Sequence, residues 1–111
     1  MLNDSSQLDR AFSALADPVR RGMLARLSLG PASVSELASP LPISLPAVLQ
    51  HLKALELSGL VASEKKGRVR TVHMEPTALT AVESWLTRRR QELEAQLDRF
   101  EQHLATLKGS D

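Results

Sequence analysis

The chain has 111 residues, of which 42% are apolar and 24% charged, and its formal net charge is only +1. This length and composition predict one soluble globular domain. The sequence contains no cysteine, which excludes disulfides, thiolate metal sites and cysteine redox switches. No apolar run approaches the roughly 18 residues that cross a bilayer, and residues 1–9 lack the features of a signal peptide, so we expect a cytoplasmic protein without a membrane partner.

Two helices are predicted before residue 30. Leu8, Phe12 and Leu15 recur at helical spacing in the first of them. Asp17 is a favourable N-cap for the second, and Pro18 suits its first position because the amide that proline lacks would stay unpaired there. The second helix is expected to bury one apolar face, made of Val19, Met23, Leu24 and Leu27.

Residues 33–58 carry the pattern of a helix-turn-helix. Ser33 and Glu36 have the spacing of a capping box at the start of a short helix. A longer helix then begins at the N-cap Ser44, has Pro46 in its first turn and runs to about residue 58. Its inward stripe is predicted to consist of Val48, Leu52 and Leu55.

The N-terminal half of this longer helix has an outward edge that suits the recognition of bases. A glutamine amide can pair with adenine in the major groove, lysine with guanine or phosphate, and leucine can touch the methyl group of thymine. His51 flanks the buried stripe, where we expect a hydrogen-bonded histidine at the margin of the core, a contact to a DNA phosphate being the alternative. The residues of this helix assigned to DNA binding are Ser44, Leu45, Pro46, Leu49, Gln50 and Lys53.

Between residues 60 and 74 the pattern changes from helical to strand-like. Two short β-rich runs flank Lys66-Gly67, and Gly67 can supply the positive φ of a tight turn. The pattern predicts a β-hairpin wing beside the preceding helix. Four of the six residues 65–70 are basic and none is acidic, which favours contacts to DNA phosphates through Lys65, Lys66, Arg68 and Arg70.

Residues 76–108 are predicted to form one long C-terminal helix. About 30 helical residues span roughly 45 Å, more than a small domain needs for its own core. Leucine or phenylalanine recurs every seven residues, with Arg90 as an interruption, so we expect two patches packed on a partner helix, an intramolecular helical core being the alternative. With the first helix, the predicted homodimer interface comprises Leu8, Phe12, Leu15, Leu86, Leu93, Leu97, Phe100 and Leu104.

Three segments resemble the ArsR/SmtB family of bacterial winged-helix repressors: FSALADPVRRGMLARL, ASVSELASPLPISLPAVLQHLKALELSGLV and GRVRTVHMEP. The resemblance spans about residues 12–85. It implies a mostly α fold with a small β-hairpin wing, a single winged helix-turn-helix domain over residues 1–111, and a homodimer formed by the first and last helices. It further implies binding to a pseudo-palindromic operator and release by a signal. Metal-sensing members carry a cysteine motif at the place where this chain has SVSELASPL. The cysteine sensor site is therefore absent from this chain.

These features predict a sequence-specific DNA-binding repressor that needs no cofactor. Two alternatives stay open: a metal-responsive repressor with Asp98, Glu101 and His103 as ligands, and a winged-helix module that binds another protein. An enzyme is not expected, since the chain has no cysteine nucleophile, no glycine-rich phosphate loop and only three scattered histidines. Either an unidentified small molecule at the dimer interface is the effector, or the protein is controlled by its own concentration.

Overall fold

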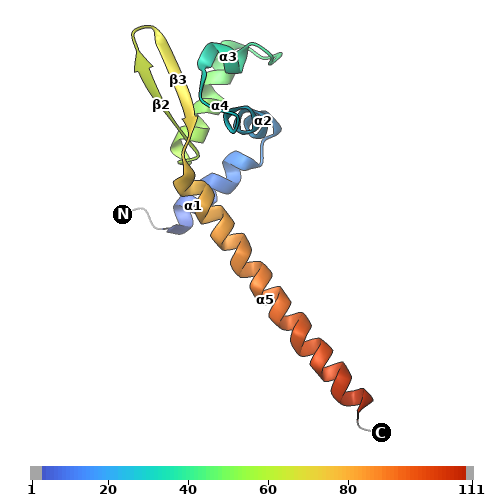
Figure 1. Cartoon of the computed structure of the whole chain (residues 1–111). Helices are drawn as coiled ribbons and strands as arrows, with labels where there is room; N and C mark the ends of the chain where they lie inside the picture. Colours follow the sequence, from blue (N-terminus) through green and yellow to red (C-terminus); the bar gives the residue numbers. More distant parts are fainter. Residues whose placement is uncertain (1–3, 110–111) are drawn as a thin grey trace.

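The computed structural model describes residues 4–109 (Figure 1). Over that range the elements are α1 (Asp4–Leu15), α2 (Pro18–Leu27), β1 (Ala32–Ser33), α3 (Val34–Ala38), α4 (Leu45–Leu57), β2 (Val61–Lys66), β3 (Val69–Met74) and α5 (Pro76–Lys108). The fold is mostly helical with a small antiparallel sheet, as the sequence predicts. None of the helices in this range combines the length and the apolar character needed to cross a membrane.

Three helices begin at the side-chain caps that the sequence predicts. The Asp17 carboxylate accepts a hydrogen bond of 3.0 Å from the backbone amide of Arg20 at the start of α2. This bond is the main reason why the pKa of Asp17 lies below its ordinary value of 3.8. Ser33 and Glu36 form the capping box of α3, and hydrogen bonds from Ser33 lower the pKa of Glu36. Ser44 caps α4 by accepting a bond of 3.3 Å from the amide three residues further on.

One hydrophobic core joins the first four helices to the sheet. Val48, Leu52 and Leu55 form the buried stripe of α4, as their spacing predicts, and Leu60 and Val72 are fully buried. The cluster is completed by Ala14, Met23, Leu24, Leu27, Ala32, Leu37, Val61 and Ala78. Full burial of a valine or leucine side chain contributes roughly 1.5–3 kcal/mol. These contacts therefore fix the orientation of α4 relative to the sheet.

The sheet contains a strand that the sequence analysis misses. The strand order is β1-β3-β2, and both pairings are antiparallel. The hairpin of β2 and β3 agrees with the prediction, and Gly67 has a φ of +61° in its turn. β1 has only two residues, too few to show alternation, and pairs Ala32 with Val72 and Ser33 with Thr71. The predicted two-stranded wing is thus part of a three-stranded sheet, and β1 joins the start of α3 to it.

Helix α5 leaves the rest of the molecule and extends alone toward the C-terminus (Figure 1). Its first turns pack on α1, where Ala78 and Val82 are buried and the rings of Phe12 and Trp85 meet edge to face with centroids 5.6 Å apart. From Leu86 to the end of the described range, no residue of α5 is buried. The longest dimension of the molecule is consequently 77 Å, against 35 and 21 Å for the other two. The alternative of an intramolecular helical core around the C-terminal leucines is therefore wrong.

Candidate nucleic-acid interface

The outward edge of α4 is exposed where the sequence predicts it. Leu45 and Leu49 are 55% and 46% exposed, although both are large apolar side chains. Gln50 and Lys53 are exposed beside them. Pro46 is exposed in the first turn, and the exposed Ser44 uses its hydroxyl oxygen as the cap of the helix. Because the buried stripe of α4 packs on the core, the exposed edge of this helix remains free for a ligand.

The basic residues of the hairpin surround its tip. Lys65 and Lys66 end β2, Arg68 lies in the turn, and all three are exposed. The register pairs Lys65 with Arg70, so these two side chains lie on one face of the hairpin. It is the face that carries the buried Val72 further along β3. The two basic side chains therefore point to the side of the sheet on which the core is packed.

A groove of about 400 Å³ separates the hairpin from the helix-turn-helix. It brings together five residues predicted to bind DNA, which are Leu45, Leu49, Lys65, Arg68 and Arg70. The other five, Ser44, Pro46, Gln50, Lys53 and Lys66, do not line it. Four further lining residues were missed by the sequence analysis: Ser33, Val34, Ser35 and Val69. The β1–β3 pairing brings the start of α3 beside the hairpin, and no sequence signal revealed that pairing.

Arg70 differs from its basic neighbours because it already has protein partners. Its guanidinium donates a hydrogen bond of 3.0 Å to Ser63 and lies 4.0 Å from a carboxylate oxygen of Glu56 on α4. The Ser63 hydroxyl in turn donates a bond of 2.7 Å to the same carboxylate. Arg68 makes no hydrogen bond or ion pair with any residue between 4 and 109. Arg70 thus links the hairpin to α4, whereas Arg68 is the arginine available to an anion.

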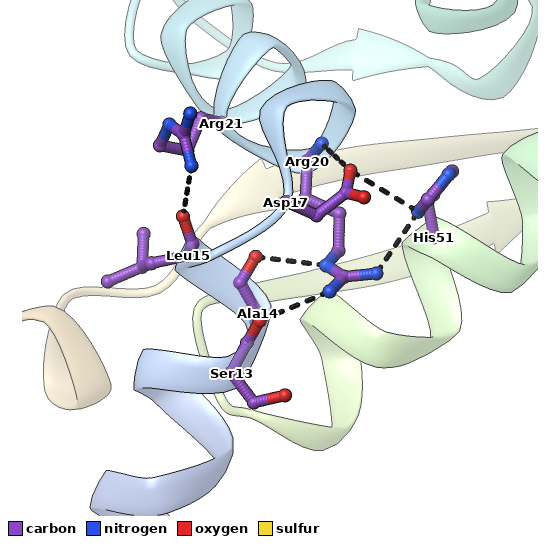
Figure 2. Close-up of polar contacts among 7 residues, drawn as sticks. All are labelled: Ser13, Ala14, Leu15, Asp17, Arg20, Arg21 and His51. Carbon is purple, nitrogen blue, oxygen red and sulfur yellow. Dashed lines mark hydrogen bonds and ion pairs between the residues drawn. The ribbon is translucent and has the colours of Figure 1, made fainter.

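A second polar link holds α4 from its other side (Figure 2). Arg20 of α2 donates hydrogen bonds of 2.9 Å and 3.1 Å to the carbonyl oxygens of Ala14 and Ser13 at the end of α1. A third nitrogen of its guanidinium lies 3.2 Å from Nδ1 of His51 on α4. Because a guanidinium can only donate, Nδ1 is the acceptor in this hydrogen bond. A single side chain therefore joins α1, α2 and α4.

The surroundings of His51 agree with the first of the two interpretations of this residue. Its side chain is mostly buried, and besides Arg20 it has the Asp17 carboxylate 3.8 Å from Nδ1. The prediction of a hydrogen-bonded histidine at the margin of the core is confirmed. The partner Arg20, 31 residues earlier in the chain, was not predicted.

The residues assigned to the dimer interface fall into two groups. On α1, Leu8 is half-buried and Phe12 lies on Trp85, while Leu15 packs against the core of its own chain. On α5, five apolar side chains are 42–59% exposed: Leu86, Leu93, Leu97, Phe100 and Leu104. A second groove, of about 380 Å³, lies between the two helices and is lined by Leu8, Ala81, Trp85 and Arg88, among others. None of the five exposed apolar residues of the α5 stripe lines this groove.

No group of three or more histidine, aspartate and glutamate side chains within residues 4–109 is arranged to hold a metal ion. Asp98, Glu101 and His103 all lie on the exposed part of α5. Within the described chain, then, no observation favours the metal-responsive alternative.

Comparison with known proteins agrees with this geometry. A family model described as a helix-turn-helix domain matches residues 15–64. The HTH-type transcriptional regulator Rv2034 of Mycobacterium tuberculosis is 48% identical over 72% of this chain and 75% of its own length. The transcriptional repressor SdpR of Bacillus subtilis is 27% identical over 71% of this chain and 88% of its own.

A solved structure supports the same assignment. The crystal structure of an ArsR family transcriptional regulator matches with a TM-score of 0.79 and 48% identity, over 85% of this chain and 97% of the other. Both the sequence of the helix-turn-helix and the arrangement of most of the fold are thus similar to those of regulators of transcription. The chain belongs to the ArsR family of winged helix-turn-helix transcriptional regulators.

Proposed function

We propose that this protein is a homodimeric repressor that binds a pseudo-palindromic DNA site. Helix α4 enters the major groove, and the hairpin contacts the flanking phosphates. The residues proposed to touch DNA are Ser44, Leu45, Pro46, Leu49, Gln50, Lys53, Lys65, Lys66, Arg68 and Arg70. Arg70 is expected to contribute less to DNA binding than Arg68, because Ser63 and Glu56 already engage its guanidinium.

The observation that carries this proposal is the groove between α4 and the hairpin. One side is the exposed edge of a helix that the core holds in a fixed orientation, and the other is a basic loop. A duplex has matching chemistry, with base edges that a helix can reach and phosphates on either side of them. The buried stripe of α4 is occupied by the core, so DNA would meet the exposed edge of this helix.

We further propose that a second copy of the chain covers the exposed stripe of α5. Leu97 and Phe100 remain more than half exposed, in a part of α5 where no residue up to 109 is buried. Apolar residues at a seven-residue repeat are covered when two such helices pack together. Leu8 and Phe12 would extend the interface onto α1. A two-fold dimer of this kind presents two α4 helices to successive major grooves, about 34 Å apart along the duplex.

Release from DNA then needs a change in the spacing or angle of the two α4 helices. A small molecule in the groove between α1 and α5 would act at the proposed interface. Control by the concentration of the dimer itself is the other route.

The test is a fluorescence-anisotropy titration of a labelled duplex from the region upstream of the coding sequence, competed with unrelated DNA at several salt concentrations. We expect a preference for the upstream duplex and an affinity that falls steeply with salt, because phosphate contacts release counterions. Arg68→Ala should weaken binding to all duplexes and reduce the slope of log affinity against log salt by about 1. Arg99→Ala, on the far part of α5, is the matched control and should change neither quantity. Salt-independent binding, or an unchanged slope in Arg68→Ala, would contradict the proposed interface.

A further inference from the structure

Three apolar side chains, together called the apolar floor below, line the groove between α4 and the hairpin. Leu45 and Leu49 stand one helical turn apart on α4, and Val69 of β3 lines the same groove. All three side chains are about half exposed, at 55%, 46% and 53%. Leucine and valine are among the residues most often buried in proteins. Three of them together in one open groove indicate a ligand that brings apolar groups of its own.

The rim of the groove limits the class of that ligand. Lys65 and Arg68 line it as cations, and within residues 4–109 neither has an ion-pair partner. Glu56 on the neighbouring surface already accepts the bond from Ser63. An apolar protein surface laid over this groove would remove these two cations from water without pairing them, which is costly. A duplex instead offers phosphates to the rim and base edges to the floor.

We propose that the apolar floor recognises the C5-methyl group of thymine in the major groove, and that Leu45 and Leu49 determine this specificity. This assignment rests on the proposed function. The methyl of thymine is the apolar group that base pairs present in the major groove, next to hydrogen-bond donors and acceptors. Val69 lines the same groove from the hairpin and adds a third aliphatic side chain to it. The DNA class that the protein prefers therefore contains thymine at the contacted position of each half-site.

The size of the effect follows from the burial of one carbon. Removing one buried methyl lowers affinity by about fourfold, the value for a single CH₂ or CH₃ group transferred from water. A dimer that contacts one such methyl in each half-site would lose about 15-fold. 5-Methylcytosine presents the same methyl group at the same place in the groove, so the experiment must separate the two bases.

The experiment starts from a duplex selected with the full chain out of a random double-stranded pool. The selected duplex is made again with deoxyuridine in place of every thymidine, which removes only the methyl groups, and both are titrated by anisotropy. We expect the wild-type chain to bind the deoxyuridine duplex about 15-fold more weakly. The double variant Leu45→Ala with Leu49→Ala should bind the thymidine duplex more weakly and show a thymidine-to-deoxyuridine ratio near 1. Gln50→Ala, on the same helix edge, should lose affinity but keep the wild-type ratio.

Several results would overturn the assignment. Equal affinity of the wild-type chain for the thymidine and the deoxyuridine duplex would contradict the thymine assignment. A wild-type ratio in the double variant would show that the methyl groups act through the shape of the DNA and not through these leucines. A gain with 5-methylcytosine in place of cytosine, without a loss with deoxyuridine, would assign the groove to methylated cytosine. Failure to enrich any duplex would contradict the proposed function itself, and the thymine assignment with it. Both leucines are exposed, so an unchanged melting temperature is the expected check on folding.

Discussion

Helices α4 and α5 use the same kind of apolar spacing with opposite results. The stripe of α4, Val48, Leu52 and Leu55, is at most 4% exposed because the rest of the same chain packs against it. The stripe of α5 beyond Leu86 is about half exposed, since that part of the helix extends away from the core (Figure 1). Periodicity therefore predicts that a helix face will be covered. It does not tell whether the cover comes from the same chain or from another.

The largest effect is expected where a charge enters the uncovered stripe. Leu97→Glu would place a carboxylate, with no partner, in the proposed seam of each α5, and an unpaired buried charge costs about 3–5 kcal/mol. The variant should be monomeric by light scattering, with the mass of a single 12.2 kDa chain. Ala95→Glu adds the same charge on an exposed face away from the seam and should leave the dimer intact. A dimeric Leu97→Glu variant would mean that α5 is covered in some other way.

Substitutions in the two stripes are expected to differ in how their effect on stability depends on protein concentration. Leu55→Ala removes a fully buried side chain from the core and should lower the free energy of unfolding by about 2–5 kcal/mol. Leu93→Ala changes only the exposed stripe of α5. Its loss of stability should appear at high protein concentration, where the dimer forms, and vanish at low concentration. Urea denaturation at two protein concentrations measures both effects. A concentration-independent loss in Leu93→Ala would show that α5 is covered within one chain.

A smaller effect is expected for the link between α1 and α4. Arg20→Ala removes the bonds to Ser13, Ala14 and His51, and hydrogen bonds from a charged group each contribute about 1.5–3 kcal/mol where they are shielded from water. Partial exposure reduces this, so we expect a loss of about 1–3 kcal/mol in stability and weaker binding to the selected duplex. Arg21→Ala is the matched control, because Arg21 donates one exposed bond, to Leu15. Equal losses in the two variants would show that the contact with His51 contributes nothing.

The smallest effect is the pH dependence of the α2 cap. The backbone amide of Arg20 lowers the pKa of Asp17 in the folded chain. The folded state then holds the proton less tightly than the unfolded state, so the stabilisation is present above the ordinary pKa of 3.8 and is lost as the pH falls below it. Asp17→Asn keeps an acceptor for the cap but cannot titrate. Its melting temperature should fall less than that of the wild-type chain between pH 5 and about pH 3, and identical pH profiles would contradict the role of the carboxylate.

Local signals made the helices predictable, whereas contacts between distant residues were not. The caps at Asp17, Ser33 and Ser44 involve partners three residues away, so their spacing alone locates the helix starts. β1 was missed because two residues carry no period and its partner is Val72, forty residues later.

The candidate site shows the same limit. Exposure of Leu49 and Gln50 follows from the helical period of α4 and was predictable. The restraint of Arg70 by Ser63 and Glu56 depends on the register of the hairpin and on its packing against α4, which no local pattern encodes. Sequence therefore located the basic residues and favoured Arg68 among them, but it did not show that Ser63 and Glu56 hold Arg70.

Pairing of two chains through α5 is tested most directly by the mass of the complex between the full chain and the selected duplex, measured by sedimentation for the wild-type chain and for Leu97→Glu. We expect two wild-type chains on each duplex, bound together, and a loss of specific binding in Leu97→Glu, because one α4 alone holds a single half-site. One chain per duplex, or Leu97→Glu binding as tightly as the wild-type chain, would contradict the claim that α5 pairs two copies to place two α4 helices on one DNA site.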